Sequence, residues 1–421
     1  MSSADVAELL LEVSDRGFGA VVEAHLENLA NKCRSAGQSV EISARDRVRW
    51  NADHSTLRGP ARCGRFRAPG RPVEAWLSRG KCRLEFFGLE RCGSIWACAE
   101  CAPRVRGARA VRMGRGFGRV VEAGGCLVDL TLTVRHELGW GLLRLLDVER
   151  QAWRSVVKDR EVVRLRRLYG WEYVSPTEVT HGANGWHPHF QAALVFPRAL
   201  SSDELDVVRA AFFSAWRRAI VAVAPDMEPD ELHGVHMEVW EESAQVFAEY
   251  VGKAGDFAQE ICRGDRKFSA GRNPFDLQAA AMRGDEGAVS LWAEYEQATA
   301  GRHAMTFSRG FWALLGEVDV AEGDEIAEVD EDRECVCQDV PPVEWNAIRR
   351  HPKGHEIVEA CLLAGLSWSE SIVELYRATP LWLLDDGVEL LHGPEWEFDA
   401  GPRQPAPPTR TGQESLWEEE F

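Results

Sequence analysis

The sequence predicts a mixed α+β protein built around an antiparallel sheet. Residues 126–135 alternate apolar and polar side chains, as a half-buried strand does. Residues 141–168 place apolar side chains at helical spacing, which predicts a long amphipathic helix. Two further strand patterns, at 171–180 and 187–196, flank an Ala-Asn-Gly sequence at 183–185 that is typical of a hairpin turn.

Three more elements follow the hairpin. A second amphipathic helix is expected over 203–223, with Ser201 or Ser202 as its N-cap. A strand is expected over 233–240 and a helix over 243–253. The resulting order of strand, helix, two strands, helix, strand and helix resembles a ferredoxin-like or RNA-recognition-type split βαβ fold.

At 421 residues the chain is too long for one typical core, so we expect several domains. The predicted division is an N-terminal helical segment (1–57), a basic Cys-rich zinc module (58–119), the α+β core (120–260), a helical extension of that core (261–316), an acidic linker (317–345), a small C-terminal helical module (346–400) and a Pro-rich tail (401–421).

The net charge of −18 alone argues against nucleic acid as a partner. Its distribution argues otherwise. Residues 58–119 hold fourteen Arg and one Lys against four Glu, a local balance of +11. Residues 317–344 hold twelve acidic side chains against Arg333 alone. One basic block and one acidic block favour a localised site for a polyanion.

The N-terminal residues carry neither a basic region nor a long apolar core, so no signal peptide is expected. No apolar run reaches the length of a membrane span. We therefore expect a cytoplasmic protein with no membrane partner. Its eleven cysteines then indicate metal binding or core packing rather than disulfides.

A cluster of cysteines lies within the basic block. Cys92, Cys98 and Cys101 form a knuckle with one preceding cysteine, and Cys63 and Cys82 lie upstream. Four thiolates bind Zn²⁺ tetrahedrally, and a small module gains folding energy from such a site. We predict a structural zinc site formed by Cys63, Cys92, Cys98 and Cys101, with Cys82 as the reserve ligand. Its arginine-rich surface, with Arg104 and Arg106, would bind DNA phosphates. The alternative is a set of buried, reduced cysteines.

The second candidate site lies on the strand that follows the hairpin turn. His187, His189 and Gln191 are two residues apart, so they share one face of that strand. The hairpin should place Glu178 opposite His187 or His189 on the same face. A carboxylate, an imidazole and an amide oxygen suit Mg²⁺ or Mn²⁺, which would neutralise charge on a phosphodiester. The alternative is a surface strand with solvated histidines.

A third pattern lies about sixty residues downstream, on the helix expected over 243–253. Tyr250 shares a helical face with Lys253. An ammonium group near a phenol favours the phenolate, so Tyr250 could act as a nucleophile with Lys253 supporting the charge. The alternative is a core-facing tyrosine beside a lysine whose amine reaches solvent.

Taken together, residues 58–316 resemble the rolling-circle replication initiators (Rep) of Gram-positive bacterial plasmids, which belong to the HUH endonuclease superfamily. The resemblance rests on four segments in the family's order: the cysteine element 92–101, the strand Leu-Thr-Leu-Thr-Val-Arg-His at 130–136, the metal motif at 178–189 and Glu-Tyr-Val-Gly-Lys at 249–253.

The resemblance implies an HUH endonuclease core at 120–260 and a fold with an N-terminal zinc-binding module. It implies that Thr131, Thr133 and Arg135 line the DNA site. Tyr250 would attack the scissile phosphate of a single-stranded or hairpin origin, which leaves a 5′-phosphotyrosine and a 3′-OH primer. The divalent ion would activate the phosphate. DNA is the implied partner, together with a host helicase and polymerase.

The chain departs from the family pattern at two places. Gln191 stands where the family has histidine, which leaves His187 as either a ligand or a neighbour that orients the substrate. Val246 stands where some relatives carry a second Tyr or a Glu that terminates replication, so termination falls to Glu249, Glu242, water or a second subunit. Two other readings compete with the initiator: a tyrosine HUH transposase or relaxase, and a non-catalytic zinc protein that binds DNA.

Overall fold

The computed structural model describes residues 42, 44–78, 83–230, 234–240, 271–317, 333–351 and 353–378. They divide into two compact units, each described here by itself. The larger unit holds the described residues of 38–71 and 89–329, and the smaller unit holds those of 72–88 and 330–421. Residues 1–41 of the predicted N-terminal segment, the helix expected over 243–253 together with Tyr250, and the Pro-rich tail lie outside the described residues, so these expectations stay predictions.

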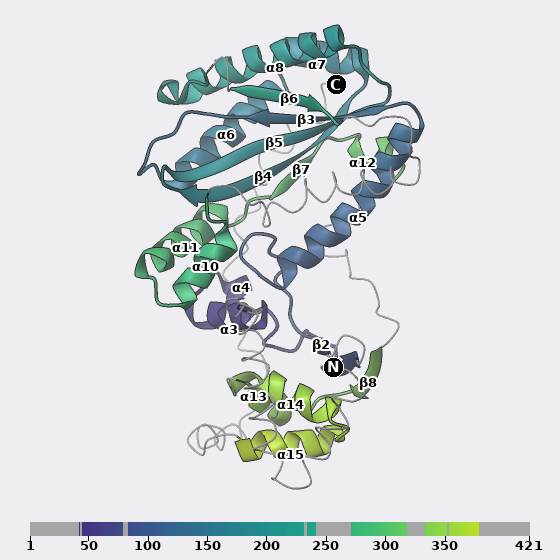
Figure 1. The fold of residues 1–421 in the computed structure, drawn as a ribbon, viewed down its shortest axis with the longest axis vertical. Helices are drawn as coiled ribbons and strands as arrows, with labels where there is room; N and C mark the ends of the chain where they lie inside the picture. The colour runs from purple at the N-terminus through teal and green to yellow at the C-terminus, as the bar shows by residue number, and fades with distance from the viewer. Residues whose placement is uncertain are drawn as a thin grey trace, which may run out of the picture. The chain divides into compact units, whose positions relative to one another are not determined.

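The larger unit combines α-helices with one antiparallel sheet (Figure 1). Its elements, in chain order, are α3 (Ala44–His54), α4 (Arg58–Arg62), α5 (Cys101–Glu122), β3 (Cys126–Leu132), α6 (Leu142–Val156), α7 (Arg160–Tyr169), β4 (Glu172–Gly182), β5 (Gly185–Phe196), α8 (Ser202–Val223), the 3-10 turn η1 (Pro225–Met227), β6 (Val235–Val239), α10 (Pro274–Met282), α11 (Glu286–Thr299), β7 (Met305–Phe307) and α12 (Phe311–Leu314).

The five strands lie in the order β6-β3-β5-β4-β7, and every neighbouring pair is antiparallel. The predicted antiparallel sheet is therefore confirmed. The chain passes from β3 through α6 and α7 to β4, on the far side of β5. It then passes from β5 through α8 to β6, on the far side of β3. Two βαβ units are thus interleaved, with β7 added at the β4 edge.

The predicted hairpin forms between β4 and β5. A two-residue turn joins Gly182 to Gly185, and Gly185 adopts φ +83°. A left-handed conformation of this kind favours glycine because it has no Cβ. The turn fixes the register, and Glu178 consequently pairs with His189 and Thr180 with His187.

The first face of the sheet packs against α6 and α8. Alternate residues of β3 and β5, such as Leu130 and Leu194, join the apolar sides of these helices in one buried core. Trp153 of α6 lies 4.7 Å from Phe190 of β5, measured between ring centroids. The N-terminus of α8 has a reciprocal cap, in which Ser201 and Glu204 each accept a hydrogen bond from the other's backbone N–H.

The helix expected over 141–168 is two helices in the structure. The break falls at 157–159, between α6 and α7. Asp159 has an extended backbone there, and its carboxylate accepts hydrogen bonds from the N–H groups of Glu161 and Val162. A carboxylate that caps the backbone in this way starts a new helix rather than continuing the old one. The apolar spacing continues across the break, which explains why the pattern looked uninterrupted.

The second face of the sheet has two halves. One half is apolar and carries Ala193 and Val195 of β5, which pack with Met113 and Phe117 of α5. Burial of such large side chains contributes about 1.5–3 kcal/mol each. The other half carries polar residues, described below. The strand alternation of β3, β4 and β5 therefore places an apolar and a polar area on one face of the sheet.

The smaller unit combines a three-stranded sheet of order β2-β1-β8 with three helices. Its elements are β1 (Glu74–Ser78), β2 (Arg83–Phe87), β8 (Arg333–Cys337), α13 (Pro342–Arg350), α14 (Gly354–Leu363) and α15 (Trp368–Ala378). Phe86 of β2 lies 4.8 Å from Trp345 of α13 between ring centroids, and the backbone N–H of Leu84 donates to Glu359 at 2.6 Å. These contacts join segments that are far apart in the sequence.

The elements of this unit come from three of the predicted segments: the zinc module, the acidic linker and the C-terminal helical module. The β1–β2 hairpin lies inside the predicted zinc module, and β8 lies inside the predicted acidic linker. Long-range pairing of this kind leaves no periodicity that a local pattern could reveal. Gly88, with φ +74°, directly follows β2, at a point where a Cβ would lie 1.7 Å from the carbonyl oxygen of Pro72. The predicted boundaries themselves stay predictions.

None of the helices in the described ranges has both the length and the apolar composition that a transmembrane helix requires.

One acidic side chain lies in the core of the larger unit. Glu149 of α6 is 2 % exposed, and neither carboxyl oxygen has a hydrogen-bond partner among the described residues. It shares its helix face with Leu145 and Trp153. Burial raises the pKa of the Glu149 carboxyl well above its usual value. The folded protein therefore holds this group neutral over a pH range in which the unfolded chain ionises it.

Folding raises the pKa of Glu149. The free energy of unfolding therefore falls as the pH rises above the pKa that Glu149 has in the unfolded chain. We predict that Glu149→Gln removes this dependence of the unfolding free energy on pH. At pH 8 the variant should exceed the parent protein in unfolding free energy by about 1–3 kcal/mol, with a smaller difference at pH 5. Urea unfolding at both pH values measures it. The exposed Glu286→Gln is the control, and equal slopes for Glu149→Gln and the parent would contradict the prediction.

Candidate functional site

Four cysteines converge in the larger unit, and they are the four predicted as zinc ligands. The sulfur atoms of Cys63, Cys92, Cys98 and Cys101 all lie within 4.8 Å of one another. Cys63 lies 3.5 Å from Cys101, and Cys92 lies 3.8 Å from Cys101, measured between sulfurs. In a tetrahedral site with Zn–S bonds of about 2.3 Å, neighbouring sulfurs are about 3.8 Å apart. The cluster could therefore hold a metal ion such as zinc.

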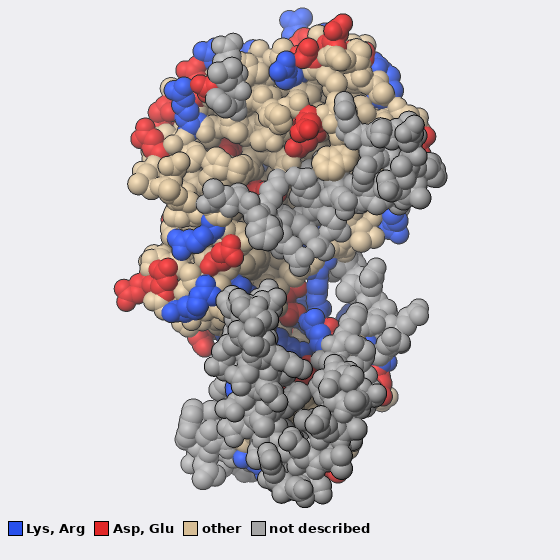
Figure 2. Space-filling model, viewed as in Figure 1, with Lys and Arg blue, Asp and Glu red and all other residues tan. Residues whose placement is uncertain are grey.

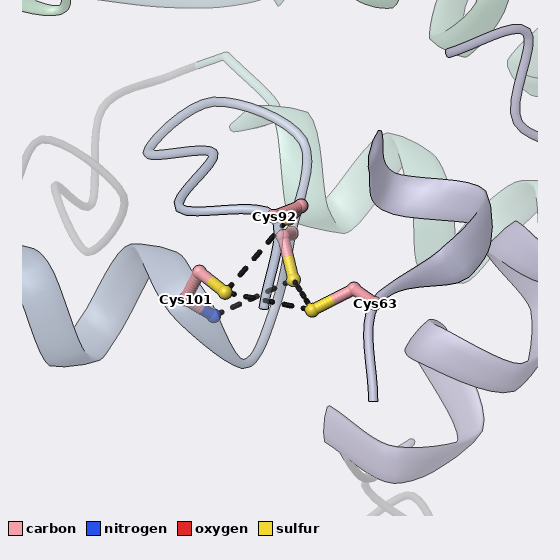
Figure 3. Close-up of side chains that lie close together, drawn as sticks. Cys63, Cys92 and Cys101 are labelled. Atoms are coloured by element: carbon pink, nitrogen blue, oxygen red, sulfur yellow. Dashed lines mark hydrogen bonds between the residues drawn. The ribbon is translucent and has the colours of Figure 1, made fainter. Parts of the chain in front are cut away.

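The local backbone turns the sulfurs toward this centre, as Figure 3 shows for Cys63, Cys92 and Cys101. The N–H of Ser94 donates to the sulfur of Cys92, and that of Cys101 donates to Cys98, both at 3.4 Å. Thiols of the neighbouring cysteines donate toward Cys101 and lower its pKa far below the usual value. The same contacts raise the pKa values of the Cys92 and Cys98 thiols, so the cluster favours a thiolate at Cys101 ahead of those two. Because a bound cation would stabilise all four thiolates, this arrangement of sulfurs suits a metal site.

A buried polar network supports the cysteine cluster. Asn51 of α3 donates to the carbonyl oxygen of Ala97 at 3.0 Å and accepts from Gln278 of α10 at 2.8 Å. Cys101 is the first residue of α5, whose later turns pack against the sheet. The cluster thus joins α4, the loop at 92–98 and α5, and its closed set of four ligands fits a structural role. Cys82, the reserve ligand, lies outside the described residues.

The second predicted site lies on the polar half of the sheet. Glu178 of β4 is directly opposite His189 of β5. Gln191 follows on the same strand and pairs with Thr131 of β3. Glu178 and Gln191 are each 4 % exposed, whereas His189 is partly exposed. Glu178, His189 and Gln191 share one face across two adjacent strands, β4 and β5. This face could hold a divalent cation between a carboxylate, an imidazole and an amide oxygen.

His187 lies on the same face of β5 as His189, two residues nearer the turn. Its Nδ1 lies 3.2 Å from Nε2 of His136, and its ring centroid lies 4.0 Å from that of His189. Burial, and to a smaller degree His136, lowers the pKa of His187, which favours the neutral imidazole. In the part of the chain that the structure describes, the cysteines are the one group of three or more His, Cys, Asp or Glu that converges as a metal site does. The ligand atoms of Glu178, His187 and His189 therefore do not lie as close to one another as the four sulfurs do.

The predicted DNA-contacting residues have different environments. Thr131 and Thr133 are partly exposed on or just beyond β3, and Arg135 is exposed, 3.5 Å from Asp230. Arg104 lies 3.5 Å from Glu100 at the start of α5. Arg106 is 6 % exposed, so its side chain is buried rather than presented at the surface. DNA contact by these residues stays a prediction.

Several arginines of the basic block (58–119) have partners within the larger unit. Arg62 pairs with Glu90 at 3.0 Å, and Arg119 pairs with Glu317. Arg112 lies over the ring of Trp312, 4.4 Å from its centroid. On the face drawn in Figure 2, basic and acidic side chains are interspersed around the rim of this unit. The excess of positive charge in the sequence therefore overstates the free positive charge of the folded surface.

Two side chains on the polar half, Asp129 and His136, were not among the site residues predicted from the sequence. Asp129 Oδ1 accepts from the amide of Gln191 at 2.7 Å. The alternation of β3 would have identified Asp129, because it shares a face with Thr131. His136 lies beyond the end of β3, and no periodicity marks its contact with His187. Tyr250 and Lys253 lie outside the described residues, so their position relative to the polar half stays a prediction.

We predict that the purified chain carries about one zinc ion and that Cys98→Ser loses it, because a missing thiolate opens a closed four-ligand site. Metal analysis by mass spectrometry measures the content. Thermal unfolding of the parent protein with and without a chelator measures the accompanying loss of stability. Cys126→Ser, which changes a cysteine outside the cluster, should keep the zinc. Full zinc content in Cys98→Ser would contradict the assignment.

Comparison with known proteins gave one informative relative. No protein-family model matches the chain, and no solved structure shows a significant match. The chain is 29 % identical over 295 residues to "Protein rep" of Streptomyces lividans. The aligned region covers 55 % of this chain and 64 % of the relative, so the chain spans less than two thirds of that protein's length.

Proposed function

We propose that this chain is a Rep-type plasmid replication protein that nicks single-stranded DNA at a rolling-circle origin. The similarity to "Protein rep" supports the replication role. The observation that carries the nicking proposal is the strand register that sets Glu178 opposite His189 and puts Gln191 on the same face. Carboxylate, imidazole and amide oxygens at one place on a sheet are suited to hold a cation against a phosphodiester.

In this proposal the polar half of the sheet binds the scissile phosphate. Glu178, His189 and Gln191 would hold Mg²⁺ or Mn²⁺, which when bound withdraws charge from a non-bridging phosphate oxygen. Thr131 of β3 pairs with Gln191 and is suited to donate to the DNA backbone nearby. The contact between His136 and His187 would orient the His187 ring beside that phosphate.

The nucleophile is proposed to be Tyr250. Its phenolate oxygen forms a bond to phosphorus, and the bond from phosphorus to the 3′ oxygen breaks. The DNA 5′ end then remains on the tyrosine as a phosphodiester, and the 3′ oxygen takes up a proton to become a primer hydroxyl. Lys253 would stabilise the phenolate through its positive charge. This part rests on the sequence motif at 249–253.

The cysteine cluster is assigned a structural role in this function. It would fix the start of α5, and α5 packs on the apolar half of the face that carries Glu178 and His189. Loss of the metal should therefore impair folding before it affects chemistry. A tyrosine HUH transposase or relaxase would share the chemistry, and the DNA that is cut distinguishes it from an initiator.

We predict that Tyr250→Phe abolishes a covalent protein–DNA product that resists SDS, because the attacking oxygen is removed. The substrates are single-stranded oligonucleotides that tile the DNA flanking the gene. Gel electrophoresis of labelled oligonucleotide with Mn²⁺ present detects the product. Tyr376→Phe in α15 of the smaller unit is the matched control and should form it normally. An undiminished product in Tyr250→Phe would reject the assigned nucleophile, and no product with any oligonucleotide would favour a non-catalytic DNA-binding protein.

The cation site has its own test. Glu178→Ala and His189→Ala should each lower the cleavage rate by about 100-fold or more, since each removes one proposed ligand of the phosphate-bound ion. The readout is the rate as a function of Mn²⁺ concentration. His236→Ala on the edge strand β6 is a control for loss of an imidazole on the same face. Cleavage that keeps its rate and metal dependence in both variants would overturn the proposed site.

A further inference from the structure

Gln191 is held by a specific partner on the neighbouring strand. Its Nε2 donates to Oδ1 of Asp129 at 2.7 Å. Asp129 pairs with Ala193, and Gln191 pairs with Thr131, so the two side chains are diagonal neighbours on β3 and β5. Gln191 is 4 % exposed and Asp129 is partly buried. The hydrogen bond joins side chains on β3 and β5, two adjacent strands in the interior of the sheet.

The chemistry of this contact determines which way the amide faces. The hydrogen bond runs from the NH₂ group of Gln191 to a carboxyl oxygen of Asp129, so the NH₂ group faces Asp129. The carbonyl oxygen Oε1 is then turned away from Asp129. Without such a partner the amide can rotate by half a turn and present its NH₂ group where its oxygen had been. An NH₂ group cannot coordinate a cation, whereas the amide oxygen can.

We propose that Asp129 is a positioning residue that makes Gln191 a metal ligand. By binding the amide nitrogen, it commits the carbonyl oxygen to the divalent ion that Glu178 and His189 would also hold. The inference rests on the proposed function, because it concerns the same cation site. It also gives a physical reason why a glutamine can serve at this position: a neutral amide needs a second residue to fix its orientation.

The test measures cation binding in the absence of DNA, so it does not depend on catalysis. Mn²⁺ is titrated into the full-length, zinc-loaded chain, and free Mn²⁺ is followed by electron paramagnetic resonance. Asp129→Asn keeps the size of the side chain but lets the amide of Gln191 face either way. We expect it to weaken Mn²⁺ binding by about 10-fold, within the range found when a residue that orients a metal ligand is lost.

Asp129→Asn also removes a negative charge, and that effect needs separate controls. Glu238→Gln removes a charge from the residue paired with Asp129 on β6, so it measures the effect of charge alone. The decisive comparison is a double-mutant cycle. If Asp129 acts through Gln191, Asp129→Asn should change Mn²⁺ binding little further once Gln191→Ala is present. Additive losses would assign the effect to charge and overturn the inference.

Two further outcomes separate this inference from the proposed function. If Glu178→Ala abolishes Mn²⁺ binding and Asp129→Asn binds as the parent does, the inference is wrong and the cation site stands. If the parent shows no Mn²⁺ binding that depends on Glu178, both are wrong. Zinc content equal to the parent in every variant confirms that the fold is kept, because the cysteine cluster lies on other elements of the same unit.

Discussion

The pairing of β4 with β5 is the constraint on which the arrangement of the polar half depends. Side chains alternate across a sheet with a period of two, so a shift of one residue exchanges its two faces. Such a shift would turn His189 and Gln191 into the core beneath α6 and α8, and it would turn Phe190 and Leu194 out of that core. The apolar contacts and the tight turn at Gly185 therefore select the same register that brings Glu178 opposite His189.

A second constraint links the cysteine cluster to that face. The cluster includes the first residue of α5, and the same helix ends against Ala193 and Val195 on the sheet. Gly116 allows close packing there, since a Cβ would lie 2.6 Å from that of Leu315. The metal ligands and the apolar half of the sheet thus hold opposite ends of one helix. The position of α5 is set by both.

Much of this arrangement could be predicted from local sequence. The alternation of β3, the turn after β4 and the capping serine of α8 are patterns within a few residues, and each formed as expected. The four cysteines were identifiable because thiol spacing reflects the geometry of a metal site. What local patterns did not reveal was long-range: the pairing of β8 with β1, and the contact of His136 with His187. Those depend on how distant segments meet, which no short window contains.

The order of the cysteines along the chain has a consequence for the smaller unit. Its β1–β2 hairpin is inserted between Cys63 and Cys92, and the bridge between Arg67 and Leu89 joins the two ends of the insertion. A metal bound by both cysteines would hold the two ends of this insertion together and so close it into a loop. While the ion is bound, the closed loop limits the conformations that the hairpin can adopt when it opens locally. One ion would then restrict a segment that none of its ligands belongs to.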